Sequence, residues 1–169
     1  MRPRLSLKGR GVQILAQREH SRSELRRKLL AHALADSVQS AGAAIEAAAD
    51  ADAAQPSAAE QVEAVLDWLQ SHHYLCEARF VESRVHARSA RFGNLRIRQE
   101  LAQHGVTLGA VAAQRLKDTE LTRAREVWSR KFGQLAADAA ERARQMRFLA
   151  GRGFSGEVIR RVLQGSGDD

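Results

Sequence analysis

Residues 147–163 have the sequence RFLAGRGFSGEVIRRVL, which contains one complete pattern of helix, turn and helix. Two closely spaced glycines interrupt the first helical run, as expected of a turn. Ser155 then suits the N-cap of a second helix, because its hydroxyl can accept a backbone N–H. Ile159 and Leu163 follow at four-residue spacing and so share one helix face. The stretch predicts a helix pair whose second helix buries an Ile/Leu anchor.

The same pattern occurs twice more in the chain. The matching residues are Ser21, Leu25 and Leu29 in the first copy, and Gly93, Ile97 and Leu101 in the second. The wide separations between copies leave room for a third helix in each module. Modules that touch mainly their neighbours build an elongated molecule with one extended face. Amphipathic stripes elsewhere and the near absence of proline predict an all-α chain of three tandem three-helix modules.

Composition suggests the boundaries between these modules. Residues 36–58 are rich in alanine and aspartate and contain almost no large apolar side chain, so we expect a flexible loop there. The other expected segments are a first helix-pair unit at 1–35, a linking helix with the second repeat at 59–116, the third repeat at 117–165 and a disordered tail at 166–169. Within them we expect a helix over 77–91 and two short helices near 107–116 and 119–132.

Charge points to a polyanionic partner. The 169-residue chain has a net charge of +7, with 23 arginines and 4 lysines. Codon usage in GC-rich genomes also favours arginine, but it does not explain why arginines recur at matching places on the modules. Arginine pairs bidentately with phosphate and carboxylate. No apolar stretch is long enough for a membrane span, and the single Cys76 fits a reducing compartment. We therefore expect a cytoplasmic protein.

Sequence motifs for catalysis or metal binding are weak. His72, His73 and Cys76 are close together, but a closed zinc site needs about four ligands. Residues 151–156 resemble a phosphate loop but lack its GK[ST] ending and a preceding strand. Trp68 and Trp128 are interpreted as core anchors. We predict no enzymatic activity, no cofactor and no metal.

Three stretches resemble the RecX family: REHSRSELRRKL at 18–29, FGNLRIRQEL at 92–101 and RFLAGRGFSGEVIRRVL at 147–163. The junction around His72-His73-Tyr74-Leu75 is also similar, with Cys76 and Glu77 in place of the usual acidic pair. The resemblance implies tandem three-helix modules in an extended, curved molecule. It also implies binding to the RecA recombinase filament, inhibition of strand exchange and ATP hydrolysis, and modulation of recombinational repair and the SOS response.

An elongated, arginine-bearing protein suits the groove of a RecA filament on single-stranded DNA, where it would meet carboxylates and phosphates together. We expect a monomer that contacts the filament and, independently of base sequence, single-stranded DNA. The candidate filament- and nucleic-acid-binding residues are Arg22, Arg26, Arg27, Arg84, Arg88, Arg91, Arg96, Arg98, Arg160 and Arg161. The spacing of positions 84, 88 and 91 predicts that they share one helix face.

Two other functions fit the same pattern. Helix-turn-helix pairs with arginine-rich second helices also occur in regulators that bind duplex DNA through the major groove. Three copies in one chain, however, lack the dimer symmetry that such regulators often use. The other alternative is a protein scaffold whose arginines meet acidic partner surfaces without nucleic acid.

Overall fold

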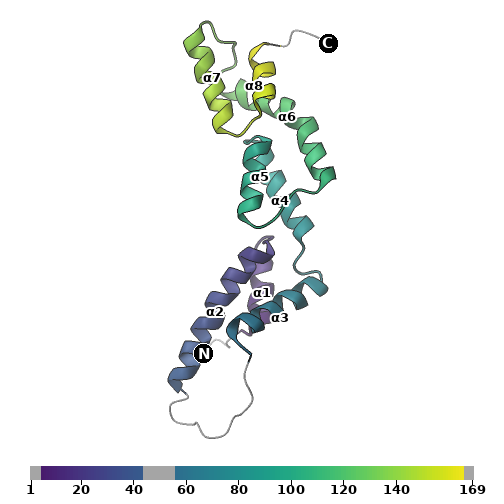
Figure 1. Ribbon diagram of the computed structural model, residues 1–169, viewed down its shortest axis with the longest axis vertical. Coiled ribbons are helices and arrows are strands. Elements are labelled where there is room, and N and C mark those ends of the chain that lie inside the picture. The colour runs from purple at the N-terminus through teal and green to yellow at the C-terminus, as the bar shows by residue number, and fades with distance from the viewer. Residues whose placement is uncertain (1–4, 44–55, 166–169) are drawn as a thin grey trace. The chain divides into compact units, whose positions relative to one another are not determined.

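The structure is a computed structural model that describes residues 5–43 and 56–165 (Figure 1). All regular elements in these ranges are α-helices, so the predicted all-α class is confirmed. Their bounds are α1 Leu7–Leu15, α2 Arg22–Ala43, α3 Ala58–Ser71, α4 Glu77–Ser89, α5 Asn94–Gln103, α6 Ala110–Lys131, α7 Ala139–Gly151 and α8 Gly156–Leu163. The chain divides into two compact units, Met1–Phe80 and Val81–Asp169. The elongated, curved shape expected of the whole molecule stays a prediction.

The N-terminal unit is a three-helix module made of α1, α2 and α3. The apolar stripe of α3, which includes Leu66 and Leu69, packs against Leu25 and Leu29 of α2, and all four side chains are fully buried. The prediction that placed this helix with the second repeat was wrong. Its stripe completes the first module because α1 and α2 alone leave the anchor leucines uncovered.

Part of the predicted loop is helical. Helix α2 continues to Ala43, so residues 36–43 belong to the helix and not to the predicted loop. No proline interrupts residues 36–43, and Ala41 and Ala43 are good helix formers, so the helix continues here although Gly42 lies in it. Residues 44–55 and the predicted tail, 166–169, lie outside the described residues. Helix α3 then begins at a capping box, in which Ser57 and Glu60 bond reciprocally.

The C-terminal unit contains the second and third modules, which share one long helix. Helix α6 packs against α5 and also against α7 and α8. Its buried residues are Leu116, Glu120, Ala124 and Val127. The predicted break between 116 and 119 was wrong. No glycine or proline interrupts this stretch, and the buried positions continue at helical spacing across it.

The repeated helix starts and anchors are confirmed. Ser21 Oγ accepts the Glu24 N–H at 3.2 Å, Ser155 Oγ accepts the Val158 N–H at 3.4 Å, and Gly93 is the N-cap of α5. The anchor residues are buried in every module: Leu25, Leu29, Ile97, Leu101, Ile159 and Leu163. The three modules therefore use one local design, as the sequence pattern predicts.

The turns of the second and third modules meet at two glycines. The N–H of Gly93 donates to the Arg152 carbonyl at 2.9 Å, and the N–H of Leu95 donates to the Gly153 carbonyl at 3.0 Å. A Cβ on Gly93 would lie 2.3 Å from the Gly153 carbonyl oxygen. A Cβ on Gly153, whose φ is +81°, would lie 2.6 Å from the Arg96 nitrogen. Only glycine allows this contact, which sets how α5 lies against the α7–α8 turn.

A buried polar network reinforces the same contact. Gly93 has no side chain to cap α5, and Glu120 of α6 supplies the cap instead by accepting the Asn94 N–H at 3.0 Å. Its other carboxylate oxygen accepts from Ser155 Oγ at 3.3 Å. The Arg123 guanidinium donates to Asn94 Oδ1 at 2.6 Å and to the Phe92 carbonyl at 2.8 Å. One carboxylate thus connects the start of α5 to the start of α8.

We expect Glu120→Ala to lower the free energy of unfolding of the C-terminal unit by about 1–3 kcal/mol, because it leaves the buried Asn94 N–H without an acceptor. Denaturant unfolding followed by Trp128 fluorescence in a Trp68→Phe background measures this. Glu126→Ala, an exposed substitution on the same helix, is the matched control. Equal stability of the two variants would show that the network contributes nothing.

Candidate functional site

In the first module, two of the three candidate arginines are engaged within the fold. Arg22 donates to Glu63 and Asp67 of α3, each at 2.7 Å, and Arg26 pairs with the same Glu63. Burial alone would lower the pKa of the Arg22 guanidinium, but its hydrogen bonds to Asp67 and Glu63 raise it. These pairs join α2 to α3. Arg27 is exposed and has no ion pair with another described residue.

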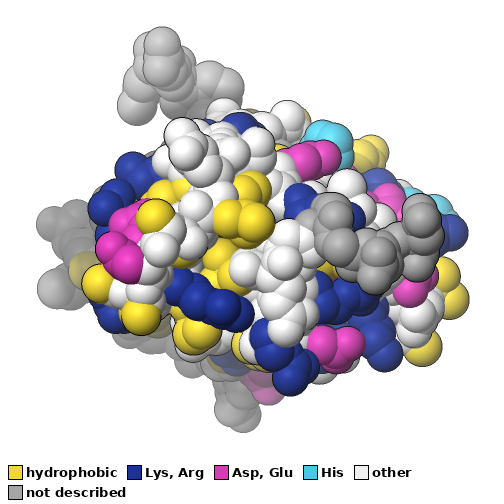
Figure 2. All heavy atoms as spheres, turned by 90° about the horizontal axis from the view of Figure 1, so that it is seen from above, with side chains coloured by type: hydrophobic (Ala, Val, Ile, Leu, Met, Phe, Trp, Pro, Cys, Tyr) yellow, Lys and Arg dark blue, Asp and Glu magenta, His cyan; other side chains and the backbone are white. Residues whose placement is uncertain are grey.

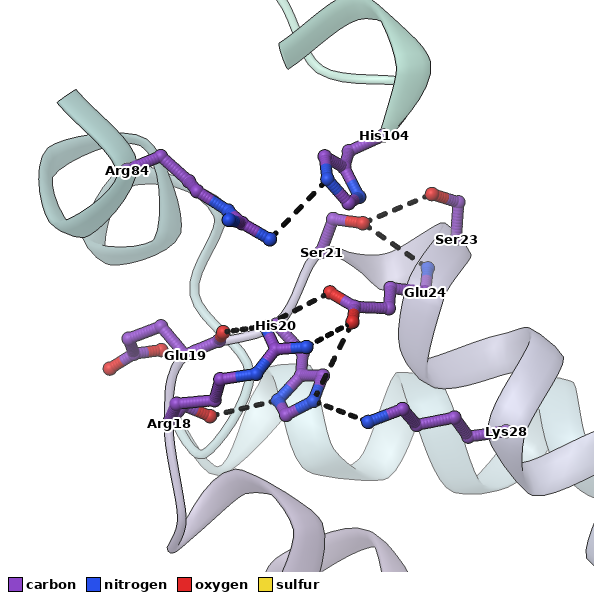
Figure 3. Close-up of polar contacts among 9 residues, drawn as sticks. All are labelled: Arg18, Glu19, His20, Ser21, Ser23, Glu24, Lys28, Arg84 and His104. Carbon is purple, nitrogen blue, oxygen red and sulfur yellow. Dashed lines mark hydrogen bonds and ion pairs between the residues drawn. The ribbon is translucent and has the colours of Figure 1, made fainter. Parts of the chain in front are cut away.

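In the second module, Glu100 forms ion pairs with two more of the candidate arginines. Its carboxylate accepts from Arg88 Nε at 2.8 Å and lies 3.9 Å from Arg96. Both guanidinium groups also lie over the Phe92 ring, at 5.7 Å and 5.1 Å from its centroid. Glu100 therefore already neutralises part of the charge of these two arginines. In the same unit, Arg84 points toward His104 at 3.4 Å (Figure 3).

The predicted shared face of positions 84, 88 and 91 was wrong. Helix α4 ends at Ser89 and Arg91 lies in the following turn, where its N–H donates to the Arg88 carbonyl at 3.0 Å. The chain must leave the helix here because Gly93 adopts an extended conformation as the N-cap of α5. Arg91 is exposed in this turn.

Four of the candidate arginines in the C-terminal unit are exposed and make no ion pair within the described residues: Arg91, Arg98, Arg160 and Arg161. Arg98 and Arg160 occupy equivalent places, three residues before the anchors Leu101 and Leu163. Arg26 has this place in the first module, where Glu63 neutralises it. The repeated position is therefore structural in the first module and open to a ligand in the second and third. We call these four arginines the open arginine set.

Sequence reasoning missed several arginines of the third module. The guanidinium of Arg152 lies 3.7 Å from the Phe148 ring centroid. The guanidinium of Arg144 lies 5.7 Å from the Phe132 ring centroid. The two phenylalanines meet edge to face at 5.1 Å. The four-residue spacing of Phe148 and Arg152 was an available signal, whereas Phe132 and Arg144 are too far apart in sequence to be paired from spacing. On the face drawn in Figure 2, basic side chains gather in several clusters, with acidic side chains between some of them.

The turn before α2 contains a buried titratable group that the sequence did not single out (Figure 3). His20 is 1% exposed. Its Nδ1 lies 2.8 Å from the Arg18 carbonyl oxygen and its Nε2 lies 2.9 Å from Lys28 Nζ. A neutral ring satisfies both contacts, donating from Nδ1 and accepting at Nε2. Glu24 pairs with Arg18 and lies 3.8 Å from Nε2. Burial lowers the pKa of the His20 imidazole, with help from the charges of Arg18 and Lys28.

This lowered pKa predicts how stability depends on pH. The usual value is 6.5, so the unfolded chain takes up a proton below that pH before the folded chain does. The free energy of unfolding is therefore expected to fall as the pH falls below 6.5. His20→Gln should flatten this part of the profile, whereas His73→Asn, at an exposed position, should not. Thermal unfolding between pH 5 and 8 measures it, and identical slopes for all three proteins would refute the role of His20.

The described ranges, 5–43 and 56–165, contain no group of three or more His, Cys, Asp and Glu residues that could hold a metal ion. None of the helices there is long and apolar enough to cross a membrane. Cys76 is a free thiol of intermediate exposure.

Comparison with known proteins identifies the family. Residues 77–113 match the family described as "RecX, second three-helix domain", and residues 118–163 match "RecX, third three-helix domain". The "Regulatory protein RecX" of Leptothrix cholodnii is 50% identical over 165 residues, which cover 96% of this chain and 90% of the relative. The chain belongs to the RecX family. The "Regulatory protein RecX" of Ralstonia nicotianae is 44% identical over 165 residues, which cover 96% of this chain and 89% of that relative.

A solved RecX structure supports the fold. The crystal structure of RecX from Lactobacillus salivarius matches with a TM-score of 0.62 at 13% identity, covering 94% of this chain and 92% of that one. The two matched RecX domains divide α6 between them, since the second ends at residue 113 and the third begins at 118. The open arginine set lies within these two RecX domains. Relatives in this family carry the name of a regulatory protein.

Proposed function

We propose that this chain is a regulator that binds the RecA recombinase filament, contacts its single-stranded DNA and inhibits strand exchange and ATP hydrolysis. In this way it would modulate recombinational repair and the SOS response in the cytoplasm, acting as a monomer and by binding alone. Membership of the RecX family supports the RecA partner. The observation that carries the mode of binding is the open arginine set, whose guanidinium groups pair with no carboxylate of the described residues.

The physical basis is charge-assisted bonding. An exposed guanidinium offers five N–H donors in a planar fork that fits phosphate and carboxylate. A RecA filament on DNA presents both kinds of acceptor, so the same arginines can meet protein and backbone together. Contacts to phosphate release counterions, and binding is therefore expected to weaken steeply with salt and to ignore base sequence.

The direct test is to titrate the full-length chain into RecA filaments on single-stranded DNA and to measure ATP hydrolysis and strand exchange. We expect both activities to fall at amounts below or near those of RecA. Unchanged activities over a wide concentration range would refute the proposal. Footprinting on duplex DNA tests the alternative of a helix-turn-helix regulator, for which protection of a defined sequence is the expected sign.

A further inference from the structure

A column of stacked rings lies on the first module and includes none of the residues that the proposed function uses. The indole of Trp68 in α3 stacks on His72, with centroids 4.3 Å apart, and on Tyr74, with centroids 5.8 Å apart. The planes are nearly parallel, at 27° and 20° to the indole. Trp68 also packs against the module core. His72 is exposed, and Tyr74 has 45% of its surface exposed.

Hydrogen bonds to the backbone fix the turn that carries His72 and Tyr74. The turn after α3 is closed by the Leu75 N–H, which donates to the Leu69 carbonyl at 3.0 Å. Arg79 fixes the same turn by donating to the His73 and Tyr74 carbonyls at 2.9 and 3.0 Å. Leu75, which follows directly, is the buried residue of the turn. The Tyr74 hydroxyl has no hydrogen bond to any described residue. Packing of the module therefore does not account for this exposed ring.

A cation lies beside the rings. The Lys8 ammonium lies 4.8 Å from the Trp68 ring centroid. Arg79 is engaged within the fold instead, because it pairs with Glu19 at 2.8 Å and donates to the His73 and Tyr74 carbonyls. Flat aromatic surface next to positive charge is the combination that binds single strands, since bases stack on the rings while cations meet the phosphates.

We propose that the Trp68–His72–Tyr74 column stacks with an unpaired base of single-stranded nucleic acid. The stacking proposal rests on the proposed function. It extends the contact with DNA from the phosphate backbone to the bases. Stacking tolerates any base because every base has a π face. The column would thus add affinity for a single strand without adding sequence preference.

The test compares two fluorescent oligonucleotides of equal length, oligothymidylate and an abasic strand with the same phosphates, by anisotropy at low salt. We expect the chain to bind oligothymidylate more tightly. Tyr74→Leu should weaken binding to oligothymidylate by about fivefold or more and leave binding to the abasic strand unchanged. Tyr74→Phe, which keeps the ring, should behave as the unaltered protein does.

A second readout reports on the site itself. In a Trp128→Phe background, whose fold is checked by circular dichroism, oligothymidylate should quench Trp68 fluorescence and the abasic strand should not. Equal affinity of the unaltered protein for the two strands, or an unchanged preference in Tyr74→Leu, would overturn the inference. RecA inhibition is measured on the same proteins. Inhibition without base preference would refute the stacking alone, and base preference without inhibition would refute the proposed function alone.

Discussion

Gly153→Ala is expected to lower the free energy of unfolding of the C-terminal unit by about 2–5 kcal/mol. Two costs add at this position. Alanine at a φ of +81° is strained, and its Cβ would lie 2.6 Å from the backbone nitrogen of Arg96. Relief requires α5 to move away from the α7–α8 turn, which breaks the hydrogen bond between Leu95 and Gly153.

Gly151, two residues earlier, provides a matched control. It is the last residue of α7, and a Cβ there meets nothing within 4 Å. Gly151→Ala should therefore leave stability unchanged or raise it by about 0.5–1 kcal/mol, since alanine is the better helix former. Denaturant unfolding followed by Trp128 fluorescence in a Trp68→Phe background measures both variants. Similar stabilities would show that the second and third modules are not held together by this glycine contact.

The triple substitution Arg98→Ala, Arg160→Ala and Arg161→Ala is expected to weaken inhibition of RecA by more than about tenfold, because each lost charge-assisted bond is worth about 1.5–3 kcal/mol. Stability should not change, since these side chains are exposed and form no ion pair with a described residue. Replacing the same three residues by lysine should restore part of the inhibition, because charge returns without the planar fork.

Arg22→Ala with Arg26→Ala is the contrasting variant. These two arginines pair with Glu63 and Asp67, so their loss should lower the melting temperature of the N-terminal unit slightly and leave inhibition intact. The expected loss of stability is modest, about 1 kcal/mol or less per pair, because the pairs are partly exposed. Loss of inhibition in this variant, with the triple variant unaffected, would place the binding face on the first module.

The sequence was sufficient to predict the repeated helix pair. The helix starts at Ser21, Gly93 and Ser155, and the anchors that follow them, depend on local spacing and capping, which a single chain displays. The continuity of α6 and the extension of α2 to Ala43 were missed for a related reason. Where no proline interrupts it, a helix continues until its packing or its solvent exposure stops it, and neither is visible in the sequence.

The candidate site was predicted less well, because an arginine's role depends on partners far along the chain. Nothing local distinguishes Arg26, neutralised by Glu63, from Arg98, which occupies the same place in its module. The sequence gives no sign of the role of Arg123, which donates to Asn94 and to the Phe92 carbonyl. Its contacts are some thirty residues away in sequence and follow only from the way α5 crosses α6.

The central claim is that the open arginine set carries the regulatory contact. The most direct measurement is RecA ATP hydrolysis on single-stranded DNA, titrated with the unaltered chain, with the triple Arg98, Arg160 and Arg161 variant and with the Arg22 and Arg26 variant. The account predicts inhibition by the first and third proteins and a loss of more than about tenfold in the second. Equal inhibition by all three would contradict it.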